Sequence, residues 1–134
     1  MEIMITFPGG KKVNAEMGGI VIPTDQPVEE GGEGTAPSPF IYFLASLGTC
    51  AGIYVLSFCQ QRSIDTEGLS LTQQMEFGID ESGKKRLSRL TLEIMLPPGF
   101  PEKYHNAIVK TAELCTVKKV VTDPPEFVIS ARRP

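Results

Sequence analysis

The chain has 134 residues, of which 41% are hydrophobic and 22% are charged, with a formal net charge of −3. This composition excludes a disordered chain, and the slight negative charge provides no general attraction to nucleic acid. The length predicts one domain over residues 1–134, and three cysteines are too few for a disulfide framework. Because no cationic segment precedes an early apolar run, we expect no secretory signal and a reducing, cytoplasmic compartment.

The first quarter of the chain predicts a three-stranded β-meander. Alternating or β-branched segments are separated by Pro8-Gly9-Gly10 and Gly18-Gly19, which are typical turn sequences. The expected strands are residues 1–7, 11–17 and 20–22. Residues 24–36 are rich in glycine and acidic residues, so we expect a loop there.

A long apolar helix is predicted to begin at Ser38-Pro39 and to end near Gln61. Serine caps helix N-termini and proline is favoured at the first helical position. No charged residue occurs from Pro37 to Gln61, so this segment could span a bilayer by length. Its serines, threonine and glycines dilute the apolarity, and Arg62 is the only nearby basic residue. We therefore interpret it as a central helix buried in a soluble core or dimer, with a membrane protein as the alternative.

The second half of the chain predicts a hairpin, a second helix and a last strand. Residues 69–77 and 87–96 form the hairpin, with Asp80-Glu81-Ser82-Gly83 at its turn. The second helix begins at Pro101 and carries an apolar stripe that ends at Cys115. Residues 126–130 form the last strand. The order βββ-α-ββ-α-β is typical of an α+β domain.

Two of the three cysteines are candidates for chemistry. Cys50 lies in mid-helix between Gly48 and Gly52, and Cys59 falls nine residues later, on the opposite side of the helix. If the second helix breaks at Cys115, this thiol would face free backbone N–H groups and two lysines, which favour a thiolate. Free cysteine is also a common inert core residue, so the pattern leaves both readings open.

The two cysteine segments together resemble those of the OsmC/Ohr family of thiol peroxidases. The matching stretches are Pro37-Ser38-Pro39, then residues 43–51 around Cys50, and Lys110-Thr111-Ala112-Glu113-Leu114-Cys115. The resemblance covers essentially the whole chain and implies an intertwined homodimer. It further implies that Cys50 attacks the peroxide and that Cys115 resolves the oxidised product.

The sequence departs from the family pattern at three positions. The family assists its peroxidatic cysteine with a glutamate and an arginine, but Phe40 occupies the glutamate position and no arginine precedes Arg62. Lys11 or Lys12 could substitute, although lysine lacks the planar geometry of a guanidinium. Thr116 replaces the usual proline. We therefore expect burial to raise the pKa of Cys50 and to make turnover slow.

The resulting hypothesis is a cytoplasmic homodimer that reduces organic hydroperoxides through Cys50 and Cys115 and is reset by an external dithiol. The alternative is a non-catalytic protein of the same fold that binds a small apolar ligand at the dimer interface. We expect no cofactor, because the chemistry resides in the thiols. We also expect no metal, since the single histidine, His105, lacks ligand spacing, and no membrane or nucleic-acid partner.

Overall fold

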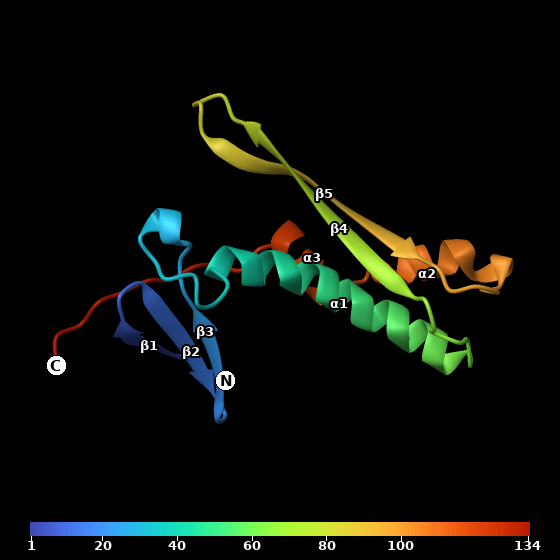
Figure 1. Cartoon of the computed structure of the whole chain (residues 1–134), viewed down its shortest axis with the longest axis horizontal. Helices are drawn as coiled ribbons and strands as arrows, with labels where there is room; N and C mark the ends of the chain where they lie inside the picture. Colours follow the sequence, from blue (N-terminus) through green and yellow to red (C-terminus); the bar gives the residue numbers. More distant parts are fainter. The chain divides into compact units, whose positions relative to one another are not determined.

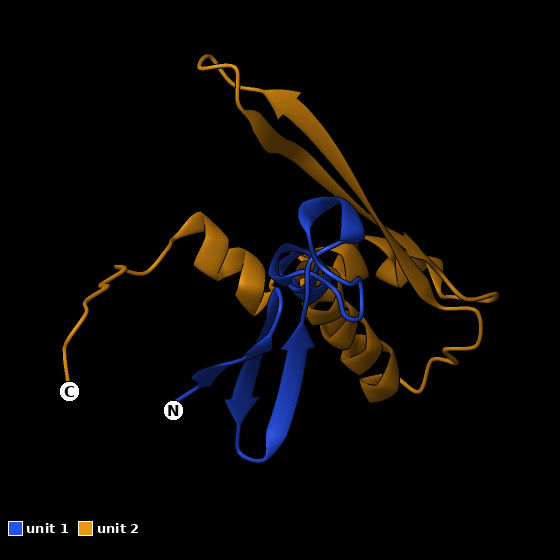
Figure 2. Ribbon diagram, turned by 60° about the vertical axis from the view of Figure 1, so that its left-hand side comes forward, with its two compact units in different colours: residues 1–46 blue, residues 47–134 orange.

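The computed structural model describes residues 1–134, which form two compact units, residues 1–46 and 47–134 (Figure 2). The first unit contains the strands β1 (Met4–Gly9), β2 (Lys12–Met17) and β3 (Ile20–Thr24), followed by the 3-10 turn η1 (Val28–Glu30). Helix α1 (Pro39–Gln61) begins in the first unit and continues into the second (Figure 1). The remaining elements are β4 (Ser70–Ile79), β5 (Lys85–Met95), η2 (Glu102–Tyr104), α2 (His105–Ala112) and α3 (Thr116–Thr122).

The three strands of the first unit form the predicted antiparallel meander in the order β1-β2-β3. Met17 pairs with Ile20 across the second turn, which consists of Gly18 and Gly19. Both glycines have positive φ, 55° and 81°, as the tight turns that match strand twist require. The diglycine sequence thus fixes the register of β2 against β3.

A buried carboxylate organises the loop that follows β3. Asp25 is 1% exposed, and its two oxygens accept hydrogen bonds from the backbone N–H groups of Gln26, Glu33 and Thr35 and from the Thr35 hydroxyl. The bonds from Thr35 are the main cause that lowers the pKa of Asp25 from 3.8 to about 2. The acidic, glycine-rich loop is therefore closed around one aspartate.

Replacing Asp25 with asparagine should lower stability at neutral pH, because an amide nitrogen would face N–H donors. The folded-state pKa of about 2 lies below the ordinary 3.8, so the carboxylate stabilises the fold above about pH 4 and this stabilisation is lost as pH falls toward 2. Urea unfolding across this range should show a steeper loss for the wild type than for Asp25→Asn. The exposed Glu29→Gln should keep the wild-type profile, and a wild-type profile for Asp25→Asn would contradict the assignment.

The second unit has its core where α1 meets α2 and the hairpin. Val55, Phe58, Cys59 and Ile108 are buried together. Side chains of the β4–β5 hairpin pack against this cluster; they are Leu71, Ile94 and, just beyond β5, Leu96. Alternation along the strands places these residues on one face of the hairpin, with Leu71 of β4 paired with Ile94 of β5.

Helix α1 has the predicted bounds but is less buried within one chain than we expected. It is long and apolar enough to cross a membrane by length and composition, with a mean hydropathy of 1.7 over an 18-residue window of which 17% is buried. Core helices of soluble proteins meet the same criterion. The hairpin and α2 of the second unit contact the side that carries Val55 and Cys59, whereas Ile53 is 55% exposed. One chain therefore does not bury this helix.

Two expectations for the last third of the chain are wrong. The second helix is shorter than the predicted span from Pro101 to Cys115, because it covers His105–Ala112 after the 3-10 turn η2, and the helix α3, which was not predicted, follows the extended Cys115. The predicted strand over residues 126–130 is absent, and residues 124–134 form no regular element. A strand needs a free sheet edge, and no other strand of this chain pairs with this segment. Its apolar side chains Phe127, Val128 and Ile129 remain at least 80% exposed.

Candidate functional site

Helix α1 and the start of α3 bring Cys50 and Cys115 together. The backbone N–H groups of Val117 and Thr116 and the thiol of Cys115 lie close enough to the sulfur of Cys50 to favour its thiolate. A hydroxyl contact one turn further along α1, between Tyr54 Oη and Thr116 Oγ1 at 3.0 Å, joins the same two elements. The predicted proximity of the two thiols is therefore observed within one chain.

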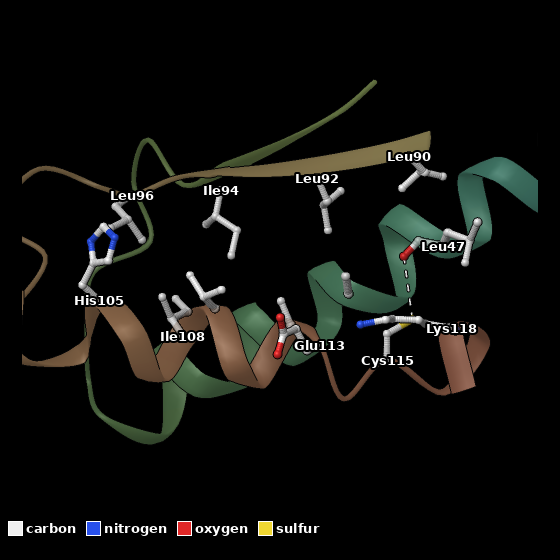
Figure 3. Close-up of a pocket in the computed structure, with 13 residues that line it drawn as sticks. Leu47, Leu90, Leu92, Ile94, Leu96, His105, Ile108, Glu113, Cys115 and Lys118 are labelled. Atoms are coloured by element: carbon white, nitrogen blue, oxygen red, sulfur yellow. Dashed lines mark hydrogen bonds between the residues drawn. The ribbon is translucent and has the colours of Figure 1, made fainter. Parts of the chain in front are cut away.

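Cys115 is held in place by its position between two helices. It is the N-cap of α3, with φ −45° and ψ 122°, and its Sγ accepts a hydrogen bond from the Lys118 backbone N–H at 3.4 Å. The thiol of Cys115 donates a hydrogen bond to the Leu47 carbonyl oxygen of α1, with a sulfur–oxygen distance of 3.8 Å (Figure 3). The extended backbone of Cys115 turns the chain so that the first N–H groups of α3 point at α1.

The two thiols of this pair differ in acidity. The Val117 N–H, assisted by the bonds from Cys115 and Thr116, lowers the pKa of Cys50 against an opposing effect of burial. Burial raises the pKa of Cys115, which is 2% exposed, and the neighbouring Cys50 raises it further. Cys50 is therefore the more acidic thiol and the better nucleophile at neutral pH, whereas Cys115 is held protonated.

These directions correct two expectations. We expected burial to raise the pKa of Cys50, but the backbone N–H groups outweigh burial at this partly exposed site. We also expected the helix break to favour a thiolate at Cys115. The Lys118 N–H does favour it, but burial is the larger effect. The break between α2 and α3 thus lowers the pKa of Cys50 on α1 rather than that of Cys115.

The remaining candidate residues lie away from the cysteine pair or are engaged elsewhere. Cys59 is fully buried in the core, and burial raises its pKa. Arg62 donates to the Phe58 carbonyl oxygen, and its guanidinium lies 3.7 Å from the centre of the Phe58 ring. Lys12 forms an ion pair with Glu33 within the first unit. No group of three or more histidine, cysteine, aspartate or glutamate side chains could hold a metal ion.

A cavity of about 370 Å³ opens beside Cys115, and sequence reasoning did not find it (Figure 3). Aliphatic side chains of β5 form one wall and α2 forms the other, while Cys50 is not among the lining residues. The cavity is lined by Leu47, Ala51, Leu90, Leu92, Ile94, Leu96, His105, Ile108, Val109, Ala112, Glu113, Cys115 and Lys118. The alternation along β5 and the α2 stripe are its sequence signals, but they do not show that the two faces leave a space.

The α+β fold brings two thiols close together, and comparisons with known proteins identify the family of the chain. The chain belongs to the OsmC-like protein family, whose model matches residues 32–130. No curated protein matches the chain in sequence.

Solved structures share the fold at low sequence identity. A candidate osmotic stress induced and detoxification response protein from Psychrobacter arcticus 273-4 is 24% identical, with a TM-score of 0.70 over 87% of this chain and 85% of that one. An organic hydroperoxide resistance protein OsmC from Legionella pneumophila is 22% identical, with a TM-score of 0.61 over 90% and 89%. The organic hydroperoxide resistance protein OhrB of Bacillus subtilis is 20% identical, with a TM-score of 0.60 over 92% and 93%.

The structure explains how threonine fits where the resemblance leads us to expect proline. Thr116 is the first residue of α3, a position that suits proline because no intrahelical bond needs its N–H. The preceding Cys115 is extended, as residues before proline prefer. The backbone N–H of Thr116, which proline would lack, helps to lower the pKa of Cys50, and the Thr116 hydroxyl contacts the hydroxyl of Tyr54.

The acidity of Cys50 can be measured by the pH dependence of its alkylation with iodoacetamide, followed peptide by peptide. Its midpoint should lie below that of an ordinary cysteine, and Cys115→Ala should move it upward because one donor to the sulfur is lost. Cys59→Ala is the matched control and should leave the midpoint unchanged. A Cys50 midpoint above that of Cys115 would contradict the arrangement.

Proposed function

We propose that this protein is a cysteine-based peroxidase that reduces organic hydroperoxides in a cytoplasmic response to oxidative stress. The single observation that supports it most is the proximity of Cys50 and Cys115, with the pKa of Cys50 lowered and that of Cys115 raised. Membership of the OsmC-like family adds support, as do structural relatives named as organic hydroperoxide resistance proteins. Both cysteines lie in the second compact unit, so one chain supplies the pair.

In the proposed reaction the Cys50 thiolate attacks the terminal oxygen of the hydroperoxide. The O–O bond breaks, the alkoxide takes a proton and leaves as an alcohol, and Cys50 becomes a sulfenic acid. The sulfur of Cys115 then attacks the Cys50 sulfur, a disulfide forms, and the hydroxyl departs as water with the Cys115 proton. An external dithiol reduces this disulfide by exchange.

Single-turnover peroxide consumption tests the role of each cysteine. Cys50→Ser should abolish consumption of an organic hydroperoxide, whereas Cys115→Ser should consume one equivalent and stop at a sulfenic acid that dimedone traps. Cys59→Ser is the control and should turn over like the wild type, because its side chain is buried in the core. Without a guanidinium to hold the peroxide, turnover should be slow, and hydrogen peroxide slower than an alkyl hydroperoxide. Wild-type consumption in Cys50→Ser would refute the proposal.

A homodimer is the second part of this proposal. The apolar helix α1 leaves Ile53 exposed, and the segment Phe127-Val128-Ile129 exposes three further apolar side chains. Exposed surface of this kind marks interaction sites in soluble proteins. A second copy of the chain would cover it and would remove the need for a membrane.

Sedimentation without detergent should show a dimer at micromolar concentration. Ile53→Lys should shift the equilibrium toward monomer, because it would place a charge in the covered face. Gln60→Lys, at an exposed polar position of the same helix, is the control and should remain dimeric. A compact wild-type monomer would contradict this part of the proposal, and a requirement for detergent would favour the membrane alternative.

The cavity supports a second candidate function, the binding of a small apolar ligand without catalysis. Its walls are largely aliphatic, and a volume of about 370 Å³ accommodates a small molecule. The two candidates give different results with Cys50→Ser: a binding protein would bind its ligand unchanged, whereas a peroxidase would lose activity.

A further inference from the structure

Tyr54 and Thr116 join helix α1 to the start of α3 through a contact that the proposed reaction does not use. Their two hydroxyl oxygens lie 3.0 Å apart, and either hydroxyl can donate the hydrogen bond. Tyr54 is half-buried and Thr116 is exposed, and neither side chain lines the cavity beside Cys115. The pair is therefore placed to act on the protein itself rather than on a molecule in the cavity.

The spacing along each element places this contact next to the two thiols. Cys50 and Tyr54 are four residues apart on α1, so they lie on the same face of the helix, one turn apart. Thr116 follows Cys115 directly and is the first residue of α3. The hydroxyl contact thus holds the residue whose backbone N–H, together with that of Val117, favours the Cys50 thiolate.

The first residue of α3 needs a constraint from outside the helix. Proline is favoured at the first position of a helix because its ring fixes φ. Thr116 has no such ring, and α3 is a short helix of seven residues. Short helices derive most of their stability from tertiary contacts. The hydrogen bond to Tyr54 is a tertiary contact of this kind, made at the residue where the helix begins.

The contact also persists when another contact between the same two elements is lost. The Cys115 thiol donates to the Leu47 carbonyl oxygen of α1 at 3.8 Å, and this bond requires the thiol hydrogen. A disulfide at Cys115 has no such hydrogen, so oxidation removes the bond to Leu47. The Tyr54–Thr116 pair involves neither sulfur and is therefore able to hold α3 on α1 in both the reduced and the oxidised protein.

From these contacts we propose that Tyr54 is a positioning residue, which holds the first turn of α3 beside Cys50 through the hydroxyl of Thr116. As a role in peroxide reduction, this inference rests on the proposed function, because that reaction starts at the Cys50 thiolate. Loss of either hydroxyl lets the first turn of α3 move away from α1. The N–H groups of Thr116 and Val117 then favour the thiolate less.

The pH dependence of Cys50 alkylation tests the inference. Tyr54→Phe removes the hydroxyl and keeps the ring, so the alkylation midpoint of Cys50 should rise by about half a pH unit to one unit, the range that one net hydrogen bond spans. Thr116→Val removes the partner hydroxyl but keeps the shape and the backbone N–H, and should raise the midpoint similarly. Thr116→Ser retains a hydroxyl and should keep the wild-type midpoint. An unchanged midpoint in Tyr54→Phe would overturn the inference.

The double variant shows whether the two hydroxyls act as one contact. If they do, Tyr54→Phe combined with Thr116→Val should have the same midpoint as either single variant. Additive shifts would contradict the proposed contact, because each hydroxyl would then act independently of the other.

Tyr104→Phe is the matched control for loss of a tyrosine hydroxyl. Tyr104 packs edge-on against the Phe58 ring in the core of the second unit. This variant should keep the wild-type alkylation midpoint of Cys50. A shift as large as that of Tyr54→Phe would indicate a general loosening of the unit and would count against a specific role for Tyr54.

Urea unfolding separates positioning from a merely structural role. If Tyr54 only stabilises the fold, Tyr54→Phe should unfold at lower urea concentration while Cys50 keeps its alkylation midpoint, and the inference fails. Thr116→Val makes the same test from an exposed position, where a substitution is tolerated more readily.

The outcome is separable from that of the proposed function because alkylation requires no peroxide. A raised midpoint in Tyr54→Phe, in a protein that consumes no organic hydroperoxide, would support the role of Tyr54 and refute the peroxidase. Peroxide consumption by the wild type with an unchanged midpoint in Tyr54→Phe would leave the peroxidase intact and refute only the role of Tyr54.

Discussion

The candidate site depends on the break in the helical chain at Cys115. The extended conformation of this residue separates α2 from α3, so the first N–H groups of α3 have no intrahelical acceptor. Two of those N–H groups, from Thr116 and Val117, favour the thiolate of Cys50. The same residue therefore supplies one thiol of the pair and, through the chain that follows it, the donors that acidify the other. A continuous helix through position 115 would provide no such donors.

Much of the fold could be predicted from local sequence. Gly18-Gly19 predicts a tight turn, Ser38-Pro39 marks the start of α1, and the alternating leucines of β5 indicate one apolar face. These signals are local because they depend on backbone preferences and on side-chain periodicity. The last strand fails for the opposite reason. Residues 126–130 have the composition of a strand, but strand formation needs a pairing partner, and neither sheet of this chain pairs with them.

The site was less accessible to sequence reasoning. The identity of Cys50 and Cys115 as a pair came from a resemblance, since 65 residues separate them and spacing alone cannot bring them together. The acidity of Cys50 was predicted with the wrong sign. The groups that lower the pKa of Cys50 are chiefly backbone N–H groups. Every residue except proline carries one, so no pattern of side chains indicates where they act. Asp25 was missed as well, because its burial follows from the loop that closes around it.

No arginine precedes Arg62, so two roles that one guanidinium can perform must be considered one at a time. A guanidinium favours the thiolate and also donates directed hydrogen bonds to the peroxide. Here the Val117 and Thr116 N–H groups perform the first task by favouring the Cys50 thiolate. Arg62 lies over Phe58 in the core of the second unit and cannot perform the second task from there. In the proposed peroxidase, Cys50 would therefore react readily with small electrophiles. Peroxides would gain only the contacts that apolar surface provides, and those contacts favour an alkyl group over the second hydroxyl of hydrogen peroxide.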